Sequence, residues 1–190
     1  MISENMRFGF WPNPRSDYES TKILAQHAEA TGWDGIWLAD HFLPKEDALI
    51  PVHESWVTMA ALARDVPRVR LGTLVTGNTY RHPAVLANMA STLDNLADGR
   101  VVLGLGAGWQ QNEHDAYGIE YGTVGSRLDR LEEACQVIKG LFHTDHFSFS
   151  GQHYQLKNAP LEPKPLQAKI PLMIGGGGEK RTLNIAAQYA

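Results

Sequence analysis

The sequence LADGRVVLGLGAGW (residues 96–109) predicts the end of a helix, a buried strand and a glycine-rich loop, in that order. Asp98-Gly99 is a turn that ends a helix beginning near Pro83, since proline is favoured in a first helical turn. The run Val101–Leu105 does not alternate apolar with polar residues, which is typical of a strand buried on both faces of a parallel sheet. The stretch therefore predicts one repeat of an α/β fold.

Four further apolar runs repeat this pattern along the chain. They are Phe8–Trp11, Gly35–Ala39, Val69–Val75 and Ile170–Ile174. The first four of the five runs begin roughly 30 residues apart, which is the length of a βα repeat. The intervals contain helical patterns, and the predicted helices cover about residues 16–32, 55–63, 83–98, 126–142 and 179 onward.

Local signals refine these elements. Ser16 and Glu19 have the spacing of a capping box, which would open the first helix. Alternating residues around Ser150-Gly151 predict a hairpin insertion at about residues 147–157. Repeated βα units leave two architectures open, a doubly wound sheet or a (β/α)8 barrel, and a barrel typically takes about 250 residues.

Composition indicates one globular domain over residues 1–190. The chain has a formal net charge of −4 and 43% hydrophobic residues, so it offers no basic surface for nucleic acid or an anionic membrane. No apolar run is long enough for a membrane span, and the N-terminus does not resemble a signal peptide. The single cysteine, Cys135, lies on the apolar stripe of a predicted helix, where packing in the core is expected. We expect a cytoplasmic protein.

The candidate ligand site lies at the carboxyl ends of the predicted strands, where parallel α/β folds bind ligands. The segments that follow the five runs are Trp11–Asn13, Asp40–Phe42, Thr76–Arg81, Gly106–Trp109 and Gly175–Gly178. Their small, aromatic and polar residues predict a pocket for a flat aromatic ligand with a phosphate. The last segment precedes a helix, so its backbone N–H groups could bind the phosphate; a flexible barrel loop is the alternative.

His41 is the best acid/base candidate, because imidazole titrates near neutral pH and this histidine directly follows a strand. A purely structural histidine is the alternative. Glu113 is a second candidate proton carrier, although an exposed carboxylate that caps a helix is equally consistent with the sequence. His143 and His146 have no obvious third ligand, so we expect helix capping and no metal site.

Five motifs occur in order along the chain: Gly35–Pro44, Thr76–Pro83, Leu93–Trp109, Arg127–Glu133 and Pro171–Gly178. In this combination the chain resembles the bacterial luciferase-like superfamily, within the branch of probable coenzyme F420-dependent oxidoreductases. The resemblance implies a (β/α)8 TIM barrel of the luciferase-like type, truncated here after the fifth βα unit. It also implies coenzyme F420 as the cofactor, with FMN as the alternative.

The resemblance assigns residues to the cofactor and the substrate. The implied cofactor-binding residues are Leu74, Val75, Thr76, Asn78, Gly106, Ala107, Gly108, Trp109, Gly176, Gly177 and Gly178. A non-prolyl cis bulge is expected within Thr73–Val75, and His41 would lie near the reacting ring carbon. Trp11, Phe42 and Tyr80 would flank the substrate.

The function implied is transfer of a hydride between the deazaflavin and a small, apolar organic substrate, with His41 exchanging the proton. Some deazaflavin dehydrogenases of this superfamily have a glutamate where this chain has Trp109, a departure that weighs against a sugar-phosphate substrate. An FMN-dependent monooxygenase and a non-catalytic flavin-binding fragment are the alternatives. A homodimer is a further possibility, and no nucleic-acid or membrane partner is expected.

Overall fold

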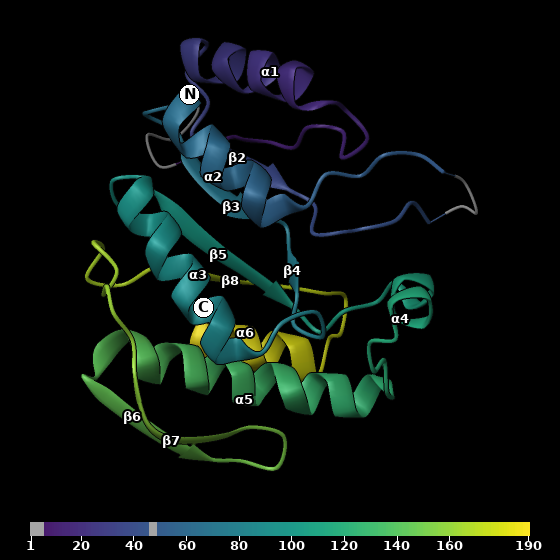
Figure 1. The fold of residues 1–190 in the computed structure, drawn as a ribbon, viewed down its shortest axis with the longest axis vertical. Helices are drawn as coiled ribbons and strands as arrows, with labels where there is room; N and C mark the ends of the chain where they lie inside the picture. Colours follow the sequence, from purple (N-terminus) through teal and green to yellow (C-terminus); the bar gives the residue numbers. More distant parts are fainter. Residues whose placement is uncertain (1–5, 46–48) are drawn as a thin grey trace.

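A curved parallel sheet forms the centre of the computed structural model, which describes residues 6–45 and 49–190. Its strands are β1 (Gly9–Phe10), β2 (Gly35–Leu38), β3 (Arg70–Thr73), β4 (Thr76–Gly77), β5 (Val101–Gly106) and β8 (Leu172–Gly175). They pair in the order β1-β2-β3-β5-β4, with β8 also on β5, and every pair is parallel. The five predicted βα repeats are confirmed (Figure 1).

The strands β3 and β4 are two halves of one strand, separated by Leu74 and Val75. Leu71 pairs with Val101, and Thr76 pairs with Leu105. The chain therefore advances five residues from Leu71 to Thr76 while β5 advances four residues from Val101 to Leu105. One extra residue in this position is a β-bulge. The Leu74–Val75 peptide bond is cis, which confirms the bulge predicted at this point.

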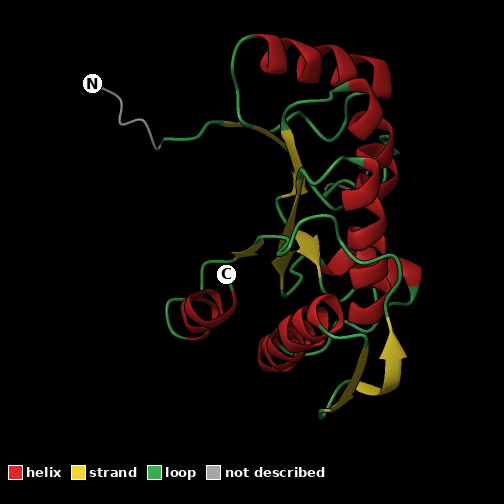
Figure 2. Ribbon diagram, turned by 90° about the vertical axis from the view of Figure 1, so that its left-hand side faces the viewer, coloured by secondary structure: helices red, strands yellow, loops and turns green. Residues whose placement is uncertain are grey.

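The long helices follow the outer side of the curved sheet (Figure 2), whereas the short α4 lies beyond the carboxyl end of β5 (Figure 1). The helices are α1 (Tyr18–Ala30), α2 (Ser55–Asp65), α3 (Pro83–Leu96), α4 (Gln111–Tyr117), α5 (Val124–His143) and α6 (Arg181–Tyr189). The core fills the space between helices and sheet, where Ile36, Leu71 and Leu103 meet Met59 and Leu131. No helix in the described ranges has the length and apolar character needed to cross a membrane.

The inner face of the sheet is shaped by one indole. Trp37 lies over Gly9, Gly35 and Gly72, three glycines of neighbouring strands, and a Cβ on Gly9 would come within 1.8 Å of the indole nitrogen. Glycine is needed there because any side chain would displace the ring. This places Trp37 on the face that a closed barrel would enclose.

The hairpin insertion is confirmed and runs slightly further than predicted. Strands β6 (His146–Ser150) and β7 (Gln155–Pro160) pair antiparallel, with His146 opposite Pro160. Glu133 of α5 accepts hydrogen bonds from the backbone N–H groups of Gln152, His153 and Tyr154, at 2.7, 3.0 and 3.1 Å. These bonds fix the hairpin turn against α5.

One local prediction was wrong, and one helix was not predicted. The capping box at Ser16 and Glu19 does not form, because Asp17 is the N-cap and accepts a hydrogen bond from Ser20 N at 2.9 Å. A capping box occurs instead at Thr123 and Ser126, where α5 begins. The short helix α4 was missed because its seven residues, QNEHDAY, have no apolar period.

Candidate active site

A cavity of about 470 Å³ opens at the carboxyl ends of β2, β4, β5 and β8. The loops after these strands and the first turns of α5 form its wall. The residues that line it are Asp40, His41, Leu74, Val75, Thr76, Gly77, Tyr80, Gly106, Ala107, Gly108, Trp109, Val124, Arg127, Leu128, Gly175, Gly176, Gly177, Gly178 and Thr182. The edge of the sheet chosen from the sequence therefore carries a cavity of the size that small-molecule ligands occupy.

Most of the predicted site residues line this cavity: His41, Tyr80 and every predicted cofactor-binding residue except Asn78. Asn78 is buried and is not part of the cavity wall, and its Nδ2 donates to the Tyr154 hydroxyl at 3.2 Å. Trp11 also lies outside the cavity wall and is 55% exposed. Phe42 packs behind the wall, with its ring 4.8 Å from that of Tyr80.

Glu113 is a carboxylate next to the cavity that makes four hydrogen bonds. The alternative interpretation of Glu113 as an exposed carboxylate that caps a helix was wrong, since its side chain is 0% exposed. Its Oε1 accepts from the backbone N–H groups of Phe42 at 2.6 Å and Leu43 at 2.9 Å, and its Oε2 accepts from the Tyr80 hydroxyl. Burial alone would raise the pKa of Glu113, but the hydrogen bonds from His41, Tyr80 and the two amides outweigh it and lower the pKa. Glu113 is therefore ionised at neutral pH.

This carboxylate sets the orientation and tautomer of His41. Glu113 Oε2 lies 3.0 Å from His41 Nδ1, and an ionised carboxylate can only accept. The Nδ1 atom therefore carries a hydrogen, which leaves Nε2 of the neutral ring as a free proton acceptor. The imidazole lines the cavity, with Trp109 edge-on at a centroid distance of 5.3 Å.

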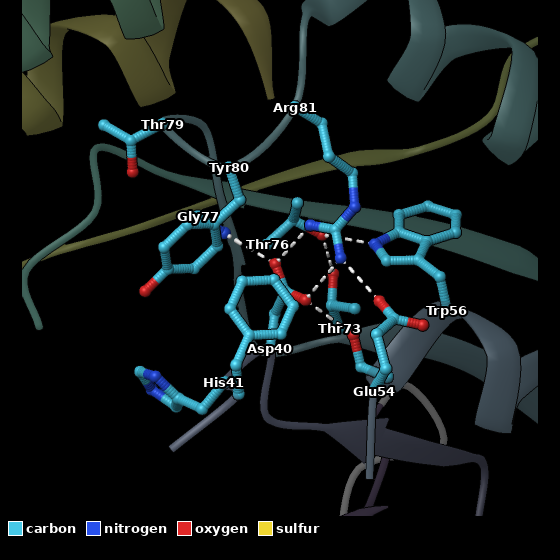
Figure 3. A network of polar contacts seen from close by, with 12 residues as sticks. Asp40, His41, Glu54, Trp56, Thr73, Thr76, Gly77, Thr79, Tyr80 and Arg81 are labelled. Carbon is cyan, nitrogen blue, oxygen red and sulfur yellow. Dashed lines mark hydrogen bonds and ion pairs between the residues drawn. The ribbon is translucent and has the colours of Figure 1, made fainter. Parts of the chain in front are cut away.

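At the cavity wall, Asp40 anchors the bulged strand (Figure 3). Its carboxylate accepts from Gly77 N at 3.0 Å and from Ser55 Oγ at 2.8 Å. It also forms two hydrogen bonds with the Arg81 guanidinium, at 2.7 and 3.0 Å, and Glu54 accepts a third from Arg81 at 2.5 Å. Burial works to lower the pKa of Arg81, but these two carboxylates raise it, so the network is ionic.

Sequence reasoning did not find Arg127, which brings a positive charge to the cavity wall. Its Nε donates to Gly108 O at 3.1 Å and its Nη1 donates to Gly122 O at 3.0 Å. These hydrogen bonds hold the side chain in place, and only 6% of the residue is exposed. The sequence did contain a signal for Arg127. A positive charge in the first turn of α5 interacts unfavourably with the helix dipole, so an arginine at this position indicates another interaction that stabilises it.

The glycines after β8 leave the backbone open to a ligand. Gly176 has φ +147°, a conformation that strains any other residue, and a Cβ on Gly177 would meet nothing within 4 Å. The helix α6 begins just beyond them, so its free N–H groups lie on the same side as these glycines. Backbone of this kind suits a phosphate group.

Two residues outside the cavity lie as expected. His143 Nδ1 lies 2.7 Å from Lys139 O, which confirms helix capping by this residue. No group of three metal-ligating side chains occurs in the described parts of the chain. Cys135 is fully buried, and burial raises the pKa of its thiol to about 12, so it is a core residue.

Comparison with known proteins places the chain in a family. The family model described as luciferase-like monooxygenase matches residues 5–190. A curated relative, the F420-dependent glucose-6-phosphate dehydrogenase of Amycolatopsis mediterranei, is 37% identical over 169 residues, covering 87% of this chain and 48% of that protein. A pyrimidine monooxygenase of Stutzerimonas stutzeri is 31% identical over 195 residues, covering 100% of this chain and 52% of that protein.

The fold comparison agrees. An F420-dependent secondary alcohol dehydrogenase, solved with an F420–acetone adduct, superimposes with a TM-score of 0.88 at 29% identity, covering 97% of this chain and 56% of that one. The chain thus spans about half the length of the relatives it matches. Its five βα units have the arrangement of a luciferase-like barrel. The chain belongs to the luciferase-like monooxygenase family and is similar to its F420-dependent members.

Proposed function

We propose that the protein is an oxidoreductase that transfers a hydride between coenzyme F420 and a small organic substrate. The observation that carries the proposal is the pair formed by ionised Glu113 and His41, with His41 facing a glycine-lined cavity. The F420-dependent relatives support the choice of cofactor, because they match most of this chain. Because the chain covers about half of each relative, its activity is proposed here and is not taken over from them.

The residues present fit a phosphorylated, planar cofactor. Leu74 is 41% exposed at the bulge and offers an apolar surface for a ring. Val75 packs against Gly106 and Gly175, where a Cβ would come within 2.7 and 2.8 Å of its methyl groups, so this wall stays flat. Arg127 and the backbone of Gly176 and Gly177 would hold the anionic group.

His41 is the residue that transfers the proton in the proposed reaction. The deazaflavin, when bound, supplies the hydride acceptor or donor. With hydrogen on Nδ1, His41 Nε2 takes the proton of an alcohol or amine as the substrate loses its hydride. The resulting imidazolium is stabilised by Glu113, and in the reverse direction it returns the proton. Tyr80 stays protonated, because burial and the hydrogen bond to Glu113 raise its pKa.

The cavity mouth favours an apolar substrate. Trp109 is 58% exposed and Val124 65% exposed, although both line the cavity. Exposed apolar side chains around a cavity indicate a surface that a ligand covers. We therefore propose a small apolar alcohol–carbonyl, alkene or imine couple as the substrate class. Trp11 and Phe42, expected at this mouth, lie outside the cavity wall.

Parallel fluorescence titrations of the chain with F420 and FMN test the cofactor. We expect saturable micromolar binding of F420 and much weaker binding of FMN. A preference for FMN would instead support the monooxygenase. Binding of neither would overturn the assignment for this chain and place the site in the complete barrel. Homodimer formation and a cytoplasmic location stay predictions, checked by analytical ultracentrifugation and cell fractionation.

A further inference from the structure

A column of aromatic rings runs along the cavity wall, which its member Tyr80 lines. Phe42, Tyr80, His114 and Tyr121 follow one another at centroid distances of 4.8, 5.0 and 4.8 Å. The Arg127 guanidinium lies 3.8 Å from the centroid of Tyr121 and ends the column. His114, a buried residue of α4 outside the cavity wall, is at its centre and has no part in the chemistry proposed above.

Both nitrogens of His114 are engaged. Nδ1 lies 2.8 Å from Gln110 O and Nε2 lies 2.7 Å from Thr79 Oγ1. A carbonyl oxygen only accepts, so Nδ1 carries the hydrogen and Nε2 of the neutral ring accepts from the Thr79 hydroxyl. The ring, which is 1% exposed, cannot turn without losing both hydrogen bonds.

His114 in turn confines Tyr80. The tyrosine ring lies between His114 and Phe42, and it also covers Gly77, where a Cβ would come within 2.5 Å of Cε2. Thr79, held by His114, is the residue that precedes Tyr80 in the chain. The ring contacts with His114 and Phe42, together with the hydrogen bond that holds the preceding residue Thr79, therefore fix the position of the Tyr80 hydroxyl.

The Tyr80 hydroxyl and His41 Nδ1 are both hydrogen-bonded to the same oxygen, Glu113 Oε2. Glu113 Oε2 accepts from Tyr80 and lies 3.0 Å from His41 Nδ1. Two donors that share one carboxylate oxygen each weaken the bond of the other, since they divide the same negative charge. Any movement of Tyr80 therefore changes how strongly Glu113 binds His41.

We infer that His114 is a positioning residue, which holds Tyr80 on Glu113 Oε2 and so sets the strength of the Glu113–His41 hydrogen bond. Thr79 acts with it, through the hydroxyl that His114 Nε2 accepts. This role rests on the proposed function for its effect on turnover, whereas its effect on the His41 ring can be measured without turnover.

The experiment compares matched variants of the full chain. His114→Phe keeps a ring in the column and deletes both hydrogen bonds. Thr79→Val deletes the hydroxyl alone, and Thr79→Ser restores it. Tyr80→Phe is the reference for complete loss of the Tyr80–Glu113 bond. His143→Phe is the control, because His143 Nδ1 makes the same contact with the carbonyl four residues earlier, remote from the cavity.

The main readout is the chemical shift of the His41 ring nitrogens in long-range ¹H–¹⁵N spectra. We expect His114→Phe and Thr79→Val to move Nδ1 in the same direction as Tyr80→Phe, by about half as much, and Thr79→Ser and His143→Phe to leave it in place. Wild-type shifts in both Thr79→Val and His114→Phe, with Tyr80→Phe displaced, would overturn the inference. If His114→Phe does not fold, the two Thr79 variants decide.

Kinetics separate this inference from the proposed function. With F420 and an active substrate, we expect kcat of Thr79→Val to fall about tenfold while the dissociation constant for F420 changes less than about threefold. An unchanged kcat would count against the positioning role. Absence of turnover in the wild-type chain would refute the proposed function for this chain and leave the nitrogen shifts to decide on His114.

Discussion

Replacing Glu113 by glutamine tests the electrostatic arrangement of the site. The substitution keeps the volume and the acceptor for the Phe42 and Leu43 amides, but it turns Oε2 into a donor. His41 Nδ1 then has to accept, which moves its hydrogen to Nε2 and removes the proton acceptor from the cavity. General acid–base catalysis typically contributes about 10²–10⁴-fold, so we expect kcat to fall by about that factor.

The same change has a calculable effect on stability. Two donors, His41 and Tyr80, lose a charged acceptor in a fully buried position, and a hydrogen bond to a charged group contributes about 1.5–3 kcal/mol. Because His41 and Tyr80 can partly reorient, we expect a loss of about 2–3 kcal/mol in the free energy of unfolding at pH 7. Urea denaturation followed by circular dichroism measures it.

The pH dependence has a definite sign. Folding lowers the pKa of Glu113 below its ordinary value of 4.5, so its contribution is complete above that pH and is lost as the pH falls through the folded-state pKa. The stability difference between wild type and Glu113→Gln should therefore shrink as the pH falls below about 4.5. Glu120→Gln, which changes a carboxylate exposed to solvent, is the control. A difference that keeps growing below pH 4.5 would contradict the lowered pKa of Glu113.

Three further predictions follow from the same contacts. Arg127→Gln should weaken F420 binding about 10- to 100-fold in a fluorescence titration, because a charge-assisted hydrogen bond is lost; unchanged affinity would exclude Arg127 from the anion site. Asp40→Asn should lower the free energy of unfolding by about 3 kcal/mol, because Arg81 keeps a buried charge with a weakened partner; a change below about 1 kcal/mol in urea would contradict this. Gly176→Ala should cost about 1–2 kcal/mol because of its positive φ, whereas Gly177→Ala should leave thermal stability intact and weaken F420 binding; equal melting temperatures for the pair would argue against the backbone assignment.

The sequence predicted the elements with strong periodicity and the edge of the sheet where they converge. Apolar runs such as Val101–Leu105 could be assigned because burial on both faces removes the polar alternation. The helix α4 could not be, since seven mostly polar residues have no such pattern, and its stability comes from contacts with a loop far away in sequence. His41 was identified from its place after a strand.

The partners of the site residues depend on contacts that no local pattern records. The burial of Glu113 results from the way α4 packs on residues 42 and 43, about 70 positions earlier. The displacement of Asn78 from the cavity follows from its bond to Tyr154 in the hairpin, an insertion whose docking the sequence did not predict. Arg127 was overlooked as a site residue because its contacts with Gly108, Gly122 and the Tyr121 ring, which place it in the cavity wall, form only in the folded chain.

The most direct test of the account is anaerobic hydride transfer in a single turnover. The chain is mixed with F420 and a panel of small secondary alcohols, and the loss of the oxidised deazaflavin absorbance is followed for wild type and His41→Asn. We predict a decay in the wild type that slows when the carbinol hydrogen is replaced by deuterium. In His41→Asn we predict a rate that is lower by a factor of about 10² or more, with the affinity for F420 retained. Equal rates in the two proteins, or decay without an isotope effect in both, would contradict the central claim that His41 moves the proton of a hydride transfer in this cavity.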